Sequence, residues 1–319
     1  MKIKYIIKRL LVAIPTFIGI TILSYFLASL APGSPLDALL SDPRITAEEL
    51  ARREVELGLD KSVIVQYFSW FQQLLQGNLG YSFSSNRLPV AQLIADRLKP
   101  TLLLAGFSFT LSILVAIPLG VFAASKPNSM RDYLSSGISF LFVGTPNFFA
   151  GLALIYIFGV VLKVLPTGGM YDSSGERTLV DLLRHMVLPM FVLSFQQIGS
   201  WIRYMRSSMV EVLQEDYLRT AKAKGLRPFA VIRKHAFKNS LLPVITVIGM
   251  SIPGLVGGAV VTEQVFSWPG IGSLMIQSIA ARDYPVIMGI TVLVAVVVLV
   301  MNLVTDMIYG ILDPRISYR

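Results

Sequence analysis

The chain has 319 residues, of which 54% are hydrophobic and 15% charged, whereas soluble domains carry about 25% charged residues. Its 28 basic and 19 acidic residues leave a net charge of +9. The absence of cysteine excludes disulfides, thiol catalysis and cysteine-ligated zinc or iron–sulfur centres. The two histidines, His185 and His235, lie far apart in the sequence, and we therefore expect no metal site.

Six long apolar runs divide the chain, and each contains between 17 and 30 residues. Asp306 is the one charged residue within them. A helix needs about 20 apolar residues to cross a bilayer core, so the pattern predicts an all-α membrane protein with six transmembrane helices in contact with lipid. The runs are Leu10–Ala31, Thr101–Ser125, Tyr133–Leu162, Met186–Ile202, Leu241–Thr262 and Pro285–Ile311.

The distribution of basic residues predicts the orientation. The segments on one side of the six runs hold 17 Lys and Arg, whereas the two short loops on the other side hold 4. Because positive charge concentrates in the cytoplasm, we expect both termini there. The first run exceeds the roughly 7–15 residues of a signal-peptide core, so we expect a retained anchor. The cytoplasmic segments are then 1–9, 126–132, 203–240 and 312–319, and the short external loops are 163–185 and 263–284.

The long external segment 32–100 is too polar for lipid. Thr46 to Glu49 matches a capping box that opens a helix, and Gly58 is placed to end it. Residues 63–75 have apolar side chains at helical spacing. We expect a small extracytoplasmic helical subdomain that either packs on the membrane helices of its own chain or contacts an external partner. The predicted organisation is thus 1–31 (N-terminus and first span), 32–100 (subdomain), 101–311 (membrane core, including loop 203–240) and 312–319 (tail).

The cytoplasmic segment 203–240 is longer than a link between two spans requires. Asp216 suits the first turn of a helix, and Gly225 is placed to end that helix. Pro228 fits the first turn of a second helix that runs toward Asn239. Three interpretations are open: a helix that docks into a cytoplasmic partner, a solvated loop whose charge fixes topology, and a DNA-reading helix-turn-helix. Both flanks enter the membrane, which disfavours a nucleic-acid partner.

Two stretches of this segment resemble a known family. They read DYLRTAKAKGL from Asp216 to Leu226 and HAFKNSLLPVIT from His235 to Thr246. Both are similar to the EAA loop of ABC importer permeases, and more narrowly to the "B" type subunit of the dipeptide/oligopeptide/nickel branch. Where the broad family has Glu-Ala-Ala, this chain has Arg219, Thr220 and a matching alanine.

Further matches extend the resemblance over nearly the whole chain. The Ile-x-Leu-Pro of the broad family is replaced by HAFK at 235–238, and this departure is itself typical of the peptide/nickel branch. None of the other matches is specific by itself, but the order and spacing of these matches together are specific to the family. They are Leu30–Pro35, Leu57–Asp60, Gly77–Gly80, Val265–Gly272, Arg282–Pro285 and Asp313–Arg315.

The resemblance implies a type I ABC importer permease fold and a role in ATP-driven import of peptides or a related small solute across a prokaryotic inner membrane. The implied partners are a homologous second permease, two cytoplasmic ABC ATPases and an extracytoplasmic solute-binding protein. This chain would hold no cofactor, since ATP and Mg would bind the ATPases. The implied coupling helix comprises Asp216, Tyr217, Arg219, Thr220, Ala221, Ala223, Lys224, Gly225 and Leu226, with support from His235, Asn239 and Pro243.

Polar and helix-breaking residues within the spans are candidates for a translocation path. They interrupt the third and fifth runs, and two glycines of the fifth run form a Gly-x-x-x-Gly spacing that permits close helix contact. Broken helices line solute paths or merely kink for packing, and packing is the favoured interpretation. The candidates are Thr145, Pro146, Asn147, Ser251, Pro253, Gly254, Gly258 and, at the outer end of the fifth run, Glu263.

The chemistry that the sequence lacks agrees with a subunit driven by partners. It contains no phosphate-binding Gly-x4-Gly-Lys-Ser/Thr loop, so ATP must be handled elsewhere. Asp306 is the lone charge in the runs, and its place near the cytoplasmic end of its span favours an interfacial position over a transport role. The alternative function is an ion-gradient-driven carrier or channel that acts without ATPases. An intramembrane enzyme would need a catalytic cluster, and none stands out.

Overall fold

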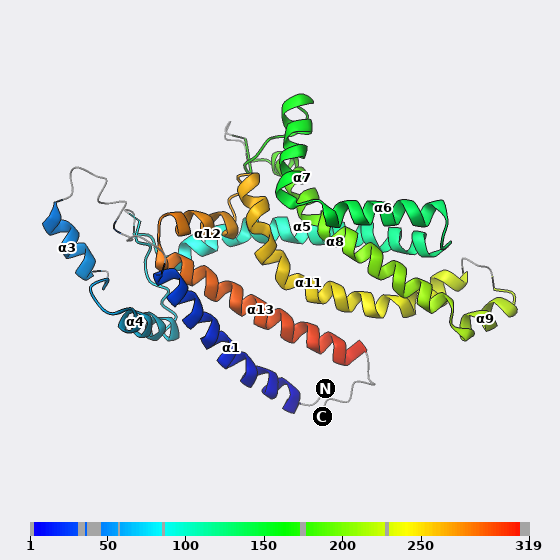
Figure 1. Ribbon diagram of the computed structural model, residues 1–319, viewed down its shortest axis with the longest axis horizontal. Coiled ribbons are helices and arrows are strands. Elements are labelled where there is room, and N and C mark those ends of the chain that lie inside the picture. Colours follow the sequence, from blue (N-terminus) through cyan, green and yellow to red (C-terminus); the bar gives the residue numbers. More distant parts are fainter. Residues whose placement is uncertain are drawn as a thin grey trace. The chain divides into compact units, whose positions relative to one another are not determined.

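The computed structural model describes residues 3–30, 36, 46–56, 58–84, 87–172, 177–226 and 230–312. These parts are helical apart from connecting segments and an isolated bridge between Tyr81 and Pro89, which confirms the predicted all-α class (Figure 1). The α-helices are α1 (Ile3–Ser29), α3 (Ala47–Glu56), α4 (Val63–Leu75), α5 (Val90–Ala124), α6 (Met130–Gly144), α7 (Asn147–Leu154), α8 (Leu179–Leu213), α9 (Asp216–Ala223), α11 (Phe237–Val265), α12 (Ile271–Ala280) and α13 (Tyr284–Leu312). Two π-helices, η1 (Ile155–Val161) and η2 (Val231–Ala236), adjoin α7 and α11.

Several of these helices are long and apolar enough to cross a membrane. Among the described residues four qualify singly, and a bent pair, Met130–Gly144 with Asn147–Val161, would make a fifth. α11 additionally covers the fifth apolar run. The count of six spans itself stays a prediction. The four single helices are Leu11–Ser29, Val90–Ala124, Leu179–Leu213 and Tyr284–Thr305.

The predicted interruption of the third run is confirmed. α6 ends at Gly144 and α7 begins at Asn147, and the two parts are bent by 101°. Thr145 has extended backbone angles (φ −91°, ψ 120°) because the ring of Pro146 disfavours the helical conformation for the residue before it.

The predicted interruption of the fifth run is wrong. α11 continues through Ser251, Pro253 and Gly254, and Figure 1 shows it bending along its length without ending. A proline removes one backbone hydrogen bond, but in an apolar segment the other backbone groups keep their partners only if the helix continues. α11 also follows η2 directly. The second helix of the cytoplasmic segment and the fifth span therefore form one continuous helical segment from Val231 to Val265. Pro228 lies outside the described residues.

The chain forms two compact units. One comprises Thr101–Trp268 and the chain from Met301 onward, and the other comprises the residues up to Pro100 with Pro269–Val300. The predicted membrane core 101–311 therefore contributes residues to both units, because α12 and the first part of α13 group with the N-terminal part of the chain.

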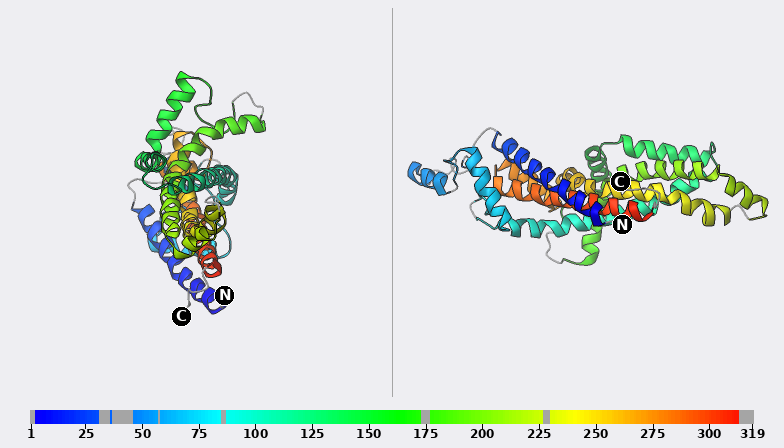
Figure 2. Two further views of the ribbon diagram at one scale, coloured as in Figure 1. Left: turned by 90° about the vertical axis from the view of Figure 1, so that its right-hand side faces the viewer. Right: turned by 90° about the horizontal axis from the view of Figure 1, so that it is seen from below.

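The first unit is built on α8, which contacts both α6 and α11 (Figures 1 and 2). Gly199 on α8 permits a close approach to α6, since a Cβ at this position would lie 2.7 Å from the backbone oxygen of Ser139. The Ser139 hydroxyl donates a hydrogen bond to the Gly199 carbonyl, which satisfies that polar group at the contact. On the other side of α8, Trp201 is buried and its Nε1 lies 3.4 Å from the hydroxyl of Ser251 on α11.

The second unit contains the predicted external subdomain. α3 begins directly after Thr46, and Gly58, two residues beyond the end of α3, has a positive φ of 68°. On α4, Tyr67 is buried and its hydroxyl lies 3.1 Å from that of Thr21 on α1. The subdomain also packs on its own chain beyond α1, through an apolar cluster of Val90, Ile94, Ile271, Leu274, Val286 and Ile290.

Candidate functional site

The predicted coupling helix forms where the sequence placed it. After α8 ends at Leu213 the chain turns through two residues, and the Glu215 carbonyl accepts the backbone N–H of Leu218 at 3.0 Å to start α9. Asp216 in the first turn interacts favourably with the positive end of the helix dipole. Gly225 then adopts a φ of 79°, which ordinary side chains rarely tolerate, so the helix stops there.

Leu218 anchors α9 to the first unit. It is 0% exposed, and apart from alanine it is the one aliphatic residue of the helix. Its neighbours come from four other elements, so burial of one side chain connects the helix to all of them. The cluster contains Leu218 with Ala124 of α5, Met205 and Met209 of α8, Val231 and Ala236 of η2, and Val244 of α11. The sequence analysis did not single out Leu218, although its place among polar neighbours was a usable signal.

A hydrogen bond adds a second attachment. The side-chain amide of Asn239 on α11 donates to the Tyr217 hydroxyl at 2.7 Å. Asn239 thus contacts the predicted coupling helix, whereas its role in supporting coupling stays a prediction. His235 is half-buried within η2, and Pro243 is exposed on α11.

The remaining predicted residues form an exposed surface of mostly polar residues. Arg219 and Asp216 pair at 3.3 Å with both side chains in solvent, so the pair contributes little to stability. The Thr220 hydroxyl donates to the Asp216 carbonyl at 3.1 Å. The side chain of Ala221 lies outside the described part of the chain. Exposed on this surface are Asp216, Tyr217, Arg219, Thr220, Ala223, Lys224, Gly225 and Leu226. α9 is thus a short, partly basic helix that is anchored by one buried residue and exposes the other side chains that the structure describes.

An ion pair connects α6 to α8 in the same unit. The Arg206 guanidinium donates to both carboxylate oxygens of Asp132, with Nη2 to Oδ2 at 2.7 Å. The backbone N–H of Asn128 adds a third hydrogen bond to this carboxylate at 2.9 Å. Asp132 is almost fully buried, so the pair fixes the connection before α6 to α8. Sequence reasoning missed this pair, because neither residue belongs to a motif.

The candidate path residues have separate environments. The Thr145 hydroxyl donates to the Leu141 carbonyl at 2.7 Å, and Pro146 is exposed at the bend. The Asn147 side-chain oxygen is buried and accepts no hydrogen bond from the described residues. The side chains of Pro253 and Gly258 lie outside the described set, and a Cβ at Gly254 would meet open space.

Glu263, a candidate path residue at the outer end of the fifth run, is buried at the end of α11. It is 0% exposed, and the Thr101 hydroxyl donates to its carboxyl oxygen at 2.6 Å. A buried carboxyl with hydrogen-bond partners inside its own unit favours a structural role, which links α5 to the end of α11.

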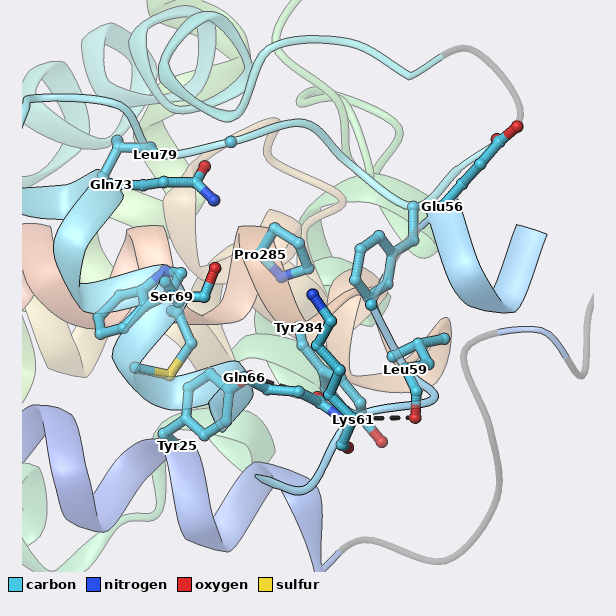
Figure 3. Close-up of a pocket in the computed structure, with 15 residues that line it drawn as sticks. Tyr25, Glu56, Leu59, Lys61, Gln66, Ser69, Gln73, Leu79, Tyr284 and Pro285 are labelled. Carbon is cyan, nitrogen blue, oxygen red and sulfur yellow. Dashed lines mark hydrogen bonds between the residues drawn. The ribbon is translucent and has the colours of Figure 1, made fainter. Parts of the chain in front are cut away.

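A cavity in the second unit was not foreseen. It has a volume of about 200 Å³, and Figure 3 shows side chains from α1, α4, the turn after α3 and α13 around it. The Gln66 side chain bridges part of its wall, because its Nε2 donates to the Lys61 carbonyl at 2.8 Å. The Trp70 indole N–H is buried and has no acceptor among the described residues. The residues that line the cavity include Tyr25, Lys61, Gln66, Trp70, Gln73 and Tyr284.

Together these features describe a protein of long apolar helices with a short, exposed polar helix, α9, between α8 and α11. Comparison with known proteins gives the family: residues 116–318 match the binding-protein-dependent transport system inner membrane component, and residues 2–105 match the N-terminal part of such membrane components. The chain belongs to this family. It is therefore a multi-pass membrane subunit of a transport system that depends on a binding protein, and not itself an enzyme.

Named relatives align over almost their full length. The oligopeptide transport system permease protein AppB of Bacillus subtilis is 44% identical over 314 residues, which cover 98% of this chain and 99% of the relative. The dipeptide transport system permease protein DppB of Escherichia coli K12 is 37% identical, with 99% of each chain covered.

Solved structures support the fold. An inward-facing structure of the MetNI methionine ABC transporter matches with a TM-score of 0.57 and 16% identity, covering 70% of this chain and 97% of that chain. An amino acid ABC transporter structure matches with a TM-score of 0.50 and 14% identity, covering 71% of this chain and 95% of that one. The predicted type I importer permease fold is thereby confirmed.

Proposed function

We propose that this chain is a permease subunit of an ATP-driven importer that translocates peptides delivered by an external solute-binding protein. The names of the relatives AppB and DppB support peptides as the solute. The complex would contain a homologous second permease and two cytoplasmic ATPases, which bind and hydrolyse ATP with Mg. Both termini of this chain would lie in the cytoplasm of a prokaryotic cell.

The attachment of α9 is the observation that carries the coupling mechanism. The burial of Leu218 joins α9 to α8 and α11, and the hydrogen bond from Asn239 to Tyr217 adds a second link to α11. A force applied to the exposed face of α9 is therefore passed to two long helices. α11 responds over its length, because it is continuous with η2.

The transport cycle then follows a two-state scheme. ATP closes the ATPase pair, α9 follows the ATPase cleft in which it sits, and the membrane helices change from inward-facing to outward-facing. Hydrolysis reverses the change. This permease needs to hold its solute only weakly, because the binding protein supplies the selective site.

A reconstituted system tests the proposal. We expect Ala223→Glu, which adds a charge to the exposed face of α9, to abolish ATP-dependent uptake of peptide and the stimulation of ATP hydrolysis by loaded binding protein. The matched control is Ala51→Glu on the exposed surface of α3, which should retain both activities. Full coupling in Ala223→Glu would contradict the assignment of α9. Vanadate-insensitive uptake by this chain alone, driven by an ion gradient, would replace the whole proposal with a secondary carrier.

The absence of cysteine makes the orientation directly measurable. A single cysteine at position 223 or 51 can be labelled with a membrane-impermeant maleimide in intact spheroplasts, without a background from other thiols. We expect labelling at 51 and protection at 223 until the membrane is permeabilised. The opposite pattern would place α9 outside the cell and exclude contact with ATPases.

A further inference from the structure

Three side chains converge at the start of α8, away from α9. Asp172 lies in the segment before the helix, whereas Asp181 and His185 lie one turn apart on it. One possible ligand atom from each residue can be chosen so that all three lie within 4.8 Å of one another. The His185 side chain is only 2% exposed, the Asp181 side chain 12% and the Asp172 side chain 60%, so the group is open on one side.

Local hydrogen bonds hold this arrangement in place. Thr178 caps α8 by accepting the backbone N–H of Asp181 at 3.2 Å. Asp181 in turn accepts the backbone N–H of Asp172 through Oδ2 at 2.9 Å, so the preceding segment is attached to the first turn of the helix. The Oδ1 atom of Asp181 remains directed to His185.

The imidazole contacts define which nitrogen carries a proton. His185 Nδ1 lies 3.0 Å from the Asp181 carbonyl oxygen and 3.1 Å from Asp181 Oδ1, and both atoms are acceptors. Nδ1 is therefore the N–H donor. In a neutral ring this leaves a lone pair on Nε2, which faces Asp172 Oδ1 at 3.6 Å. A metal cation between these two atoms would be bound by both of them.

No basic side chain supplies that cation among the described residues. The Arg177 guanidinium lies over the ring of Tyr171, 5.7 Å from its centroid, and Arg184 is directed to the Val164 carbonyl. Neither Asp172 nor Asp181 forms an ion pair with Lys or Arg in the described part of the chain. The two carboxylates of the group favour a divalent cation.

We propose that Asp172 and His185 bind a divalent transition-metal cation of the zinc class, and that Asp181 orients the imidazole through its contact with Nδ1. One imidazole nitrogen with carboxylate oxygens suits Zn²⁺, Co²⁺ or Ni²⁺ better than Mg²⁺ or Ca²⁺, which prefer oxygen ligands alone. Metal–ligand bonds of about 2.0–2.2 Å fit a cation between His185 Nε2 and Asp172 Oδ1, with an angle of about 120°. Water completes the coordination from the exposed side of Asp172.

The cation has a structural consequence for the loop before α8. Gly169 donates its backbone N–H to the Phe266 carbonyl at 2.8 Å, so the loop is already attached to the end of α11. Metal ligation of Asp172 fixes the same loop to α8. The site thus connects α8 to the end of α11 through one short segment, and it does not depend on which solute the protein carries. The sequence alone did not predict this site, because the chain has only two histidines and they lie far apart. The position of the Asp172 carboxylate beside His185 is set by the fold.

Binding of Zn²⁺ to the purified full-length chain tests the proposal. The chain is prepared with a histidine-free tag, treated with a chelator and titrated with ZnCl₂ by calorimetry at pH 7.5. We expect one saturable site per chain and a higher unfolding temperature with Zn²⁺. Asp172→Asn should weaken binding at least about tenfold, because even residues that only orient metal ligands cost about that much. Asp96→Asn, which changes an exposed aspartate on α5, should bind Zn²⁺ like the unmodified chain.

Cu²⁺ spectroscopy identifies the nitrogen ligand. The sequence has two histidines and no cysteine, so imidazole hyperfine coupling in the Cu²⁺ spectrum should disappear in His185→Gln and persist in His235→Gln. Asp172→Asn decides the question if His185→Gln does not fold, because Asp172 is largely exposed. Absence of a saturable site in the folded chain would overturn the proposal. Unchanged binding in Asp172→Asn would equally overturn it.

Discussion

The burial of Leu218 leads to a quantitative expectation for how α9 is held. In Leu218→Ala the helix loses a fully buried side chain, and the surrounding residues from four elements cannot all close the gap. Leu→Ala changes in cores cost about 2–5 kcal/mol, so about 3 kcal/mol is a fair value for this site. The hydrogen bond between Asn239 and Tyr217 remains and contributes about 1 kcal/mol.

The expected loss of anchoring is large enough to measure. Because each 1.4 kcal/mol corresponds to a factor of ten, 3 kcal/mol raises the population of detached α9 by about 150-fold. Hydrogen exchange of the peptide covering residues 214–226 should accelerate by up to that factor in the variant. Exchange at Trp201, deeper in the same unit, should change little, because the loss is local.

Leu242→Ala is the matched control, since this leucine on α11 is 40% exposed. It should leave exchange of α9 unchanged. Exchange in Leu218→Ala within threefold of the unmodified chain would contradict the anchoring role of Leu218, and so would the same acceleration in Leu242→Ala. In the reconstituted importer, Leu218→Ala should also reduce peptide uptake per ATP hydrolysed, because a detached helix transmits less force.

Three other changes have defined outcomes. Asp132→Asn should cost about 2 kcal/mol in unfolding experiments, because it leaves Arg206 partly buried without its carboxylate, and the double variant with Arg206→Gln should recover part of this loss. Gly199→Val should lower the unfolding temperature, since its Cβ would lie 2.7 Å from a carbonyl oxygen of α6, whereas Gly137→Val should not, because a Cβ there meets nothing within 4 Å. Gly225→Ala should cost about 1 kcal/mol at its φ of 79°, and exchange of the α9 amides reports the resulting fraying; unchanged exchange would contradict the strained turn.

Local features of the sequence were sufficient to predict most of the helices. The absence of charge over long runs requires helices in a bilayer, because every backbone group must then be paired within its own segment. Gly58 and Gly225 were expected to end helices, and both have positive φ angles. Pro146 interrupts its run as expected, whereas Pro253 does not. A proline is compatible with either outcome, and packing around it decides between them.

The tertiary structure decided everything that depends on partners distant in the chain. Leu218 is an anchor only because α5, α8, η2 and α11 meet around it, and Asp132 is paired only because α6 lies along α8. The same holds for His185, whose nearby Asp181 is visible in the sequence while Asp172 arrives from a loop. Periodicity and composition are local properties that determine helices and their surroundings. The contacts between those helices depend on which side chains face one another, and only the folded chain specifies that.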